Sequence, residues 1–157
     1  MKIARHGDLC LDGSRAGIPG RKRCDGDGGR VICLRRTVME YDDLLRKAAE
    51  ALTNLDAEGL VGCYAAEFIL DDASSGMLIT DKNELREYYD RLFSLPEISF
   101  TEVEFFNLGE SAAGQWTWGG VSQSGEKYKI RGASLFKLGL EGIREENLFY
   151  DPRAAME

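Results

Sequence analysis

The spacing of apolar residues changes along the chain, from three or four residues in its first half to two residues in its second half. From Tyr41 onward apolar positions follow a helical stripe, with charged residues between them, which predicts an amphipathic helix. The segment from Asn54 to Asp56 ends that pattern, and Asp56 is a suitable N-cap for a second helix. The apolar face expected for this second helix consists of Leu60, Val61, Tyr64, Ala65 and Phe68.

A third helix has the clearest start signal. Thr80 and Asp81 are candidate N-caps, and Glu84, three residues after Asp81, gives that pair the form of a capping box. Pro96 closes the helix, because a proline disfavours helical backbone in the residue before it. The apolar side of this helix is expected to contain Leu85, Tyr88, Tyr89, Leu92 and Phe93.

Beyond Pro96 the apolar period falls to two, which is typical of half-buried strands. A short strand is predicted over Phe68–Asp71, and four longer ones follow the third helix, joined by short glycine-containing turns. The four are Ser99–Leu108, Ala113–Gln123, Tyr128–Leu138 and Ile143–Tyr150. Helices followed by a run of strands indicate an α+β fold, with three helices packed on one curved, mostly antiparallel sheet.

Residues 1–36 have no sustained period and contain seven glycines, with nine Lys or Arg against four Asp. We expect a flexible basic tail, because this composition buries little apolar surface. A basic arm for an acidic partner and upstream sequence carried in by an early start remain alternatives, since Met39 lies where the regular pattern begins. The folded domain is expected over residues 39–152, with a short tail at 153–157.

The charge of the remaining 121 residues, eleven basic against twenty-three acidic, argues against nucleic acid as a partner. No run of about 18 apolar residues predicts a membrane span, and no apolar signal segment is evident, so we expect a cytoplasmic protein that does not bind membranes. The four cysteines form no CxxC pair and His6 is the single histidine, so we expect neither a metal nor another cofactor. Carboxylates and tyrosines then remain as candidates for proton transfer.

Four segments together resemble the SnoaL-like branch of the nuclear transport factor 2-like (NTF2-like) superfamily: Asn54-Leu55-Asp56, CYAAEFILDD, ELREYYDRLF and IREENLFYDP. That superfamily includes polyketide cyclases, ketosteroid isomerases and many non-enzymatic binders. The resemblance covers about residues 39–152. It implies a cone in which helices and a bent sheet enclose an apolar pocket for a small molecule, and dimerisation through the outer face of the sheet.

Alignment with the ketosteroid isomerase pattern places Asp72 at the position of the catalytic base. Asp71 and Asp72 are neighbours on a strand and face opposite sides, so one of them at most points into a pocket. The alternative that both are solvated at a strand end stays open. The two groups with which the isomerases hold an enolate oxygen fall at Ala48 and Ser134 here, so we do not expect steroid isomerase activity.

Glu146 and Tyr150 complete the set of candidate catalytic residues. If Ser134 points inward, hairpin register turns Arg144, Glu146 and Tyr150 inward too, where Glu146 could pair with Arg144 and Tyr150 could serve Asp72. The opposite parity would instead bring Asp151 inside. Candidate pocket residues are Tyr64, Phe68, Tyr89, Phe93, Trp116, Trp118, Ser134 and Phe136, although aromatic residues also fill ordinary cores.

Two functions therefore remain open from the sequence. One is a cofactor-independent cyclase or isomerase that performs acid–base proton transfer on an apolar carbonyl-bearing substrate. The other is a non-catalytic ligand-binding or dimerisation module of the same fold, as one fold hosts many functions.

Overall fold

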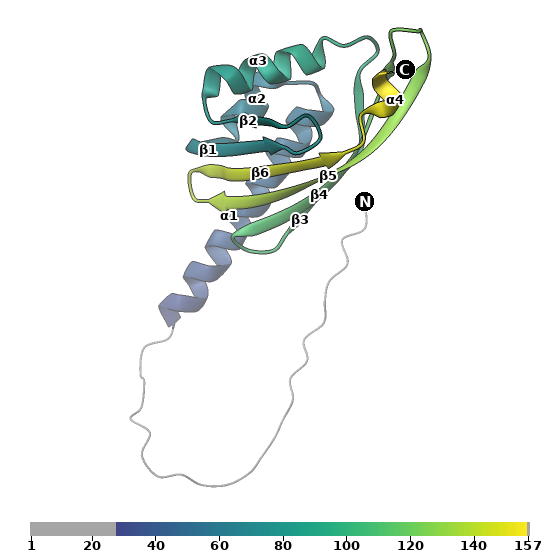
Figure 1. The fold of residues 1–157 in the computed structure, drawn as a ribbon. Helices are drawn as coiled ribbons and strands as arrows, with labels where there is room; N and C mark the ends of the chain where they lie inside the picture. The colour runs from purple at the N-terminus through teal and green to yellow at the C-terminus, as the bar shows by residue number, and fades with distance from the viewer. Residues whose placement is uncertain (1–27, 157) are drawn as a thin grey trace, which may run out of the picture.

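The computed structural model describes residues 28–156, with side chains over residues 40–153 and at residue 155. The helices of this part of the chain are α1 Gly28–Thr53, α2 Ala57–Gly62, α3 Lys82–Phe93 and α4 Arg153–Met156. The strands are β1 Tyr64–Asp72, β2 Met77–Ile79, β3 Ser99–Asn107, β4 Ser111–Val121, β5 Lys127–Gly139 and β6 Gly142–Tyr150 (Figure 1).

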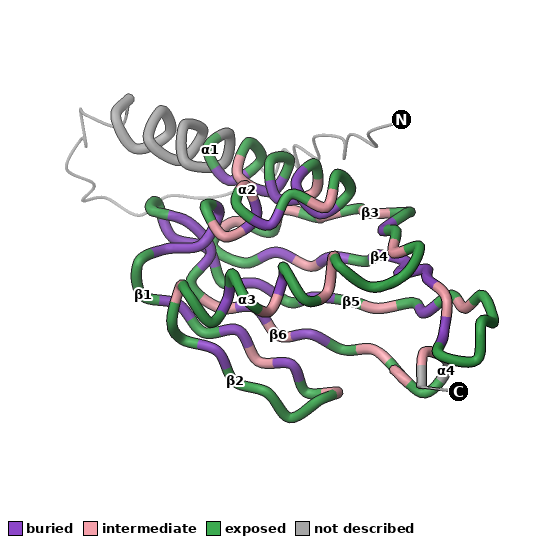
Figure 2. The backbone as a smooth tube through the Cα atoms, turned by 90° about the horizontal axis from the view of Figure 1, so that it is seen from above, coloured by how far each residue is buried: buried purple, intermediate pink, exposed green. Residues whose placement is uncertain are grey.

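The six strands form one sheet in the order β2-β1-β6-β5-β4-β3. Neighbouring strands are antiparallel except β1 and β6, which run parallel. The predicted α+β fold with a mostly antiparallel sheet is therefore confirmed. Helices α1, α2 and α3 contribute side chains to the same interior as β3–β6, and buried positions alternate with exposed ones along the strands (Figure 2).

The predicted helix starts at Asp56 and Asp81 are confirmed by their hydrogen bonds. The Asp81 carboxylate accepts from the backbone N–H groups of Asn83, at 2.8 Å, and Glu84, at 3.1 Å. The Asp56 carboxylate accepts from the N–H of Gly59 at 2.9 Å. Each carboxylate therefore satisfies donors that the first helical turn leaves unpaired.

Helix α1 begins at Gly28, so residues 28–36 are helical and not irregular as predicted. Once a helix is nucleated, each added residue gains one hydrogen bond, so extension needs no apolar stripe of its own. The rest of the predicted tail, residues 1–27, lies outside the described residues. At the other end, α4 was not predicted and includes most of the expected C-terminal tail.

The second helix is shorter than predicted, because β1 begins at Tyr64. Tyr64, Ala65 and Phe68 fit a helical period, yet all three are buried strand residues. β1 pairs with β6 at Tyr64 and again from Ile69 to Asp72, with an irregularity between them, and this tertiary contact overrides local spacing. The short strand β2 was also not predicted, because two of its three residues are exposed and show no alternation.

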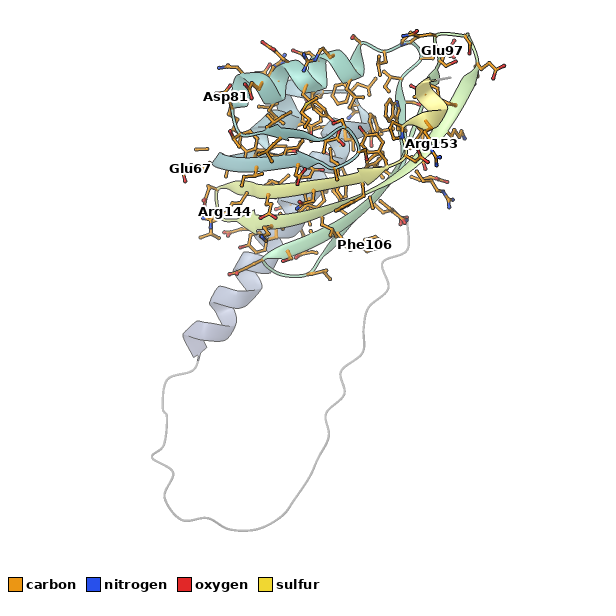
Figure 3. All side chains as sticks on the ribbon, in the orientation of Figure 1. Glu67, Asp81, Glu97, Phe106, Arg144 and Arg153 are labelled. Atoms are coloured by element: carbon orange, nitrogen blue, oxygen red, sulfur yellow. The ribbon has the colours of Figure 1, made fainter. Side chains whose placement is uncertain are left out.

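A β-bulge decides which residues of β6 face the interior. Lys137 pairs with Glu145, but the next residue, Leu138, pairs with Ile143, so Arg144 has no partner across the hairpin. Arg144 is exposed, binds Glu141 and points away at the end of the hairpin (Figure 3). The predicted pairing of Arg144 with Glu146 is therefore wrong.

The same register places Ser134 opposite Leu148 and Phe136 opposite Glu146, and all four are buried. Tyr150 lies two residues further on the same face of β6, half-buried. The inward parity for Glu146 and Tyr150 is thus the one that occurs, and Asp151 is exposed.

Replacement of Gly132 by alanine is expected to lower the free energy of unfolding by about 1–3 kcal/mol. A Cβ at Gly132 would lie 2.1 Å from the ring of Trp116, which is itself buried and cannot retreat freely. Chemical denaturation followed by tryptophan fluorescence measures this loss. Gly62→Ala is the matched control, because a Cβ there meets nothing within 4 Å. An equal effect of both substitutions would contradict the proposed steric cause.

Candidate functional site

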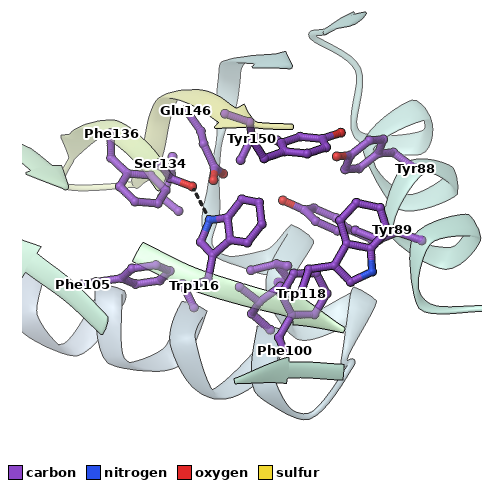
Figure 4. A pocket seen from close by; sticks show the side chains of 16 residues that line it. Tyr88, Tyr89, Phe100, Phe105, Trp116, Trp118, Ser134, Phe136, Glu146 and Tyr150 are labelled. Atoms are coloured by element: carbon purple, nitrogen blue, oxygen red, sulfur yellow. Dashed lines mark hydrogen bonds between the residues drawn. The ribbon is translucent and has the colours of Figure 1, made fainter. Parts of the chain in front are cut away.

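A pocket lies between the three helices α1–α3 and strands β3–β6 (Figure 4). Its cavity volume is about 50 Å³. The total empty space, which includes the opening to solvent, is about 580 Å³. This is room for a few waters or a small organic group without rearrangement. The lining residues are Ala48, Leu52, Leu60, Tyr88, Tyr89, Leu92, Phe100, Phe105, Trp116, Trp118, Ser134, Phe136, Ile143, Glu146, Leu148 and Tyr150.

Five of the eight residues predicted to line a pocket do so: Tyr89, Trp116, Trp118, Ser134 and Phe136. The other three, Tyr64, Phe68 and Phe93, lie outside the lining and support it from behind. The rings of Tyr64 and Phe68 pack edge to face at 5.2 Å. Phe93 packs on Tyr89 at 5.6 Å and on Phe100 at 6.1 Å.

Sequence reasoning missed several lining residues, chiefly Tyr88, Phe100 and Phe105. Tyr88 was assigned to the apolar side of α3, which contained the signal for it. Phe100 and Phe105 lie on β3, where a bulge between Thr101 and Glu104 shifts the register, so simple alternation could not place both.

Glu146 is a buried carboxyl group in the pocket wall. The hydroxyl of Tyr64 donates a hydrogen bond to Glu146 Oε2, and the hydroxyl of Tyr89 lies 2.8 Å from that of Tyr64. Burial raises the pKa of Glu146, while hydrogen bonds from Tyr64 and Ser134 oppose this shift. Burial is also the main cause that raises the pKa values of Tyr64 and Tyr89. A carboxyl group in this setting can hold or release a proton nearer to neutral pH than a solvated one.

Asp72 is also buried, at 1% exposed, but its carboxylate is not part of the pocket wall. Oδ1 accepts the backbone N–H groups of Ser74, at 3.0 Å, and Ser75, at 3.2 Å. Oδ2 accepts the hydroxyl of Tyr150 at 2.8 Å. Asp72 thus fixes the turn after β1 and one lining tyrosine. The Asp72 side chain is therefore not in position to contact a ligand in the pocket. Asp71, its neighbour on β1, faces the other side of the strand.

Tyr150 is the residue that joins Asp72 to the pocket. The Ser74 side chain donates to the carbonyl oxygen of Tyr150 at 2.6 Å and accepts from its N–H at 3.1 Å, so the turn also holds its backbone. Burial, then the hydrogen bond to Asp72, raises the pKa of Tyr150. Burial likewise raises the pKa of Tyr88, with a smaller contribution from nearby Tyr150. In Figure 4 the hydroxyl groups of Tyr88 and Tyr150 point toward each other across the pocket.

The rest of the lining is apolar and combines aliphatic side chains with aromatic rings. The indole N–H of Trp116 donates to Ser134 Oγ at 3.1 Å, as Figure 4 shows. The Trp116 ring lies 5.9 Å from Phe100 and 5.8 Å from Tyr150. Within the described residues no group of three or more potential metal ligands occurs, and no helix has the length and apolar character that a membrane crossing requires.

Comparison with known families gives the context of this pocket. The profile of the SnoaL-like domain matches residues 45–144, which extend from α1 into β6. The chain belongs to the SnoaL-like domain family. No curated protein matches it.

Solved structures similar to this SnoaL-like protein share its fold at low sequence identity. A candidate polyketide cyclase from Xanthomonas campestris is 13% identical with a TM-score of 0.65, over 74% of this chain and 94% of that one. A candidate SnoaL-like polyketide cyclase from Shewanella putrefaciens is 20% identical, with a TM-score of 0.59 over 74% and 92% of the two chains. A hypothetical protein of ketosteroid isomerase-like fold from Catenulispora acidiphila, solved in complex with trimethylamine, is 17% identical, with a TM-score of 0.63 over 71% and 88%. At these identities the likeness concerns the fold.

Proposed function

We propose that this SnoaL-like protein binds an apolar, carbonyl-bearing small molecule in its pocket and transfers a proton to and from it, as a cyclase or isomerase does. Glu146 is the proposed acid–base group. The observation that carries this proposal is the position of Glu146, a buried carboxyl in the pocket wall whose pKa is raised by burial. A proton acceptor next to a bound carbonyl compound can remove a proton from the adjacent carbon.

The proposal differs from the sequence prediction in the residue that acts on the substrate. Asp72 was the leading candidate base, but both of its oxygens already accept hydrogen bonds from the chain. Glu146 has a hydrogen-bond donor in Tyr64, which would stabilise the carboxylate whenever the proton is on the substrate. The resemblance of the fold to candidate polyketide cyclases supports chemistry next to a carbonyl group.

Exchange of protons next to a carbonyl group for deuterium tests this activity. Cyclohexanone and 2-tetralone in D₂O, followed by ¹H NMR, are expected to exchange faster with the protein than without it. Glu146→Gln is expected to lower the catalysed rate by about 10²–10⁴-fold, the usual contribution of a positioned acid–base group. Asp71→Asn is the control, because Asp71 faces away from the pocket and should leave the rate unchanged. Equal rates for wild type and Glu146→Gln would refute the assigned role.

A non-catalytic binding protein is the second candidate, and one observation favours it. Ala48 and Ser134, which occupy the positions of the isomerases' oxyanion donors, both line the pocket. The N–H of Trp116 is bound to Ser134 and the Ser134 hydroxyl to Glu146, so neither of these two positions offers a developing enolate oxygen a free donor. Ligand binding by wild type and Glu146→Gln without any exchange in either would favour this function.

We also propose that two copies associate through the outer face of the sheet. Leu135 and Phe106, each 51% exposed, lie on this face with Ala113 between them in the register of β3, β4 and β5. Phe149, 47% exposed, lies on the same face of β6. An apolar surface of this kind is typical of a protein interface.

Replacement of Leu135 by glutamate is expected to convert a dimer into a monomer, because a charge would be buried at the centre of the interface. Light scattering after size-exclusion chromatography measures the mass. Lys129→Glu is the control, since Lys129 is exposed near the far end of β5. A wild-type mass of one chain would refute the association.

A further inference from the structure

Most of the hydroxyl and indole protons around the pocket are already used in hydrogen bonds within the chain, and the most important of these is the hydroxyl proton of Tyr150. A carboxylate has no proton to give, so the 2.8 Å contact with Asp72 uses the single hydroxyl proton of Tyr150. Asp72 cannot turn away, because its other oxygen holds the N–H groups of Ser74 and Ser75. Tyr150 therefore presents an acceptor to the pocket and no donor.

The hydroxyl protons of Tyr64 and Tyr89 and the N–H of Trp116 are also used in hydrogen bonds within the chain. With Glu146 ionised, the proton of Tyr64 is used on that carboxylate, so Tyr89 must be the donor in its 2.8 Å contact with Tyr64. The Trp116 N–H is used on Ser134. Two donors among the described lining residues stay uncommitted: the Tyr88 hydroxyl, which has no hydrogen-bond partner there, and the buried indole N–H of Trp118.

The charge around the pocket is negative. Glu146 lies in the wall and Asp72 lies behind Tyr150, and none of the described lining residues is basic. The buried end of Lys82 is near, but its Nζ is held by the carbonyl oxygens of Val61, at 2.8 Å, and Tyr64, at 2.7 Å, outside the lining. A ligand with its own positive charge would therefore meet the Glu146 carboxylate directly and the charge of Asp72 through Tyr150, with no cation among the described lining residues.

The aromatic residues near Tyr150 favour the same kind of guest. The Trp116 and Trp118 rings each lie 5.8 Å from the ring of Tyr150, and Tyr88 faces them from α3 (Figure 4). Aromatic rings attract cations, most strongly where water is excluded.

We infer that the pocket recognises a protonated amine on its apolar ligand, bound at the Tyr150 end, with Asp72 as the positioning residue that keeps the Tyr150 hydroxyl an acceptor. The inference rests on the proposed small-molecule pocket but not on proton transfer. If proton transfer also holds, the substrate class is an apolar amino ketone. The amine N–H then donates to Tyr150, and the carbonyl end lies toward Glu146.

A matched pair of ligands tests the inference. Cyclohexylamine, which is protonated at pH 7, and cyclohexanone have the same ring, but one presents donors and a positive charge whereas the other presents an acceptor. We expect wild type to bind cyclohexylamine about tenfold more tightly than cyclohexanone, as measured by chemical-shift titration. Equal affinity, or a preference for the ketone, overturns the inference.

Asp72→Asn tests the part played by Asp72. The N–H groups of Ser74 and Ser75 require the amide oxygen, so the amide NH₂ must face Tyr150 and donate to it. The Tyr150 proton then turns toward the pocket, and the preference for the amine is expected to fall to about onefold. Tyr150→Phe, which deletes the acceptor, should also lower the preference for the amine. It is the variant to use if Asp72→Asn does not fold. Asp71→Asn should keep the wild-type ratio.

The outcomes separate this inference from the proposed function. A preference for the amine without any deuterium exchange supports the inference and refutes the proposed proton transfer. Deuterium exchange without a preference for the amine supports the proposed proton transfer and refutes the inference. A preference that persists in both Asp72→Asn and Tyr150→Phe but is lost in Glu146→Gln would place the amine at Glu146 and overturn the role of Asp72.

Discussion

Asp72→Ala is expected to lower the free energy of unfolding by about 3–5 kcal/mol, the usual cost of removing one partner from a buried charged network. The Asp72 carboxylate is 1% exposed and accepts three hydrogen bonds, two from the turn after β1 and one from Tyr150. Alanine would leave the Tyr150 hydroxyl and the Ser74 N–H without these partners, while the Ser75 N–H would keep its 3.2 Å hydrogen bond to the carbonyl oxygen of residue 72. Urea denaturation monitored by circular dichroism gives the loss.

Asp71→Ala is the matched control for this experiment. Asp71 is the same residue type, one position away on β1, and it is part-exposed with its side chain on the other face. We expect its replacement to change the free energy of unfolding by less than about 0.5 kcal/mol, as is usual for surface substitutions. Similar losses for the two aspartates would show that the hydrogen bonds of Asp72 contribute little to stability.

The pair of aspartates illustrates how far the sequence leads. Strand alternation correctly predicts that one of them faces inward, and the resemblance directs attention to Asp72. Neither source of information reveals that the Asp72 oxygens are occupied by Ser74, Ser75 and Tyr150, because those contacts depend on the turn geometry after β1. A resemblance at one position therefore does not predict whether its side chain reaches the pocket.

The inner face of β6 also could not be predicted from the sequence alone. Alternation alone leaves two parities, and the structure selects the one that buries Glu146 and exposes Asp151. The bulge that excludes Arg144 has no clear local signal, since the flanking glycines, Gly139 and Gly142, fit an ordinary hairpin equally well. The helix caps at Asp56 and Asp81, by contrast, are set by short-range chemistry and were predicted correctly.

The stability of the wild-type protein is expected to fall with rising pH because of Glu146. Burial raises the pKa of Glu146 in the folded state above its unfolded value of about 4.3. Below the unfolded pKa both states are protonated and the group costs nothing. As pH rises through the window up to the folded pKa, the unfolded state releases its proton first, so stability is lost by about 1.4 kcal/mol for each unit between the two pKa values.

Glu146→Gln removes this dependence, so its free energy of unfolding relative to wild type should increase with pH across that window. Denaturation series at several pH values measure it. Glu145→Gln is the control with the opposite sign, because a hydrogen bond from Lys137 lowers the pKa of Glu145. Its contribution is present above the unfolded pKa and is lost as pH falls. Parallel curves for wild type and Glu146→Gln would contradict the raised pKa.

Tyr64→Phe should increase the loss of unfolding free energy with rising pH, because the Tyr64 hydroxyl donates a hydrogen bond to the Glu146 carboxylate. Above the folded pKa of Glu146 we expect a loss of about 1.5–3 kcal/mol, the range for a hydrogen bond to a charged group. Below it the loss should be smaller, since a protonated carboxyl needs that donor less. In the Glu146→Gln background the loss should be small and independent of pH, and the coupling that a double-mutant cycle shows above the folded pKa measures how strongly Tyr64 supports the ionised form. A loss that is independent of both pH and Glu146 would mean that Tyr64 acts through packing alone.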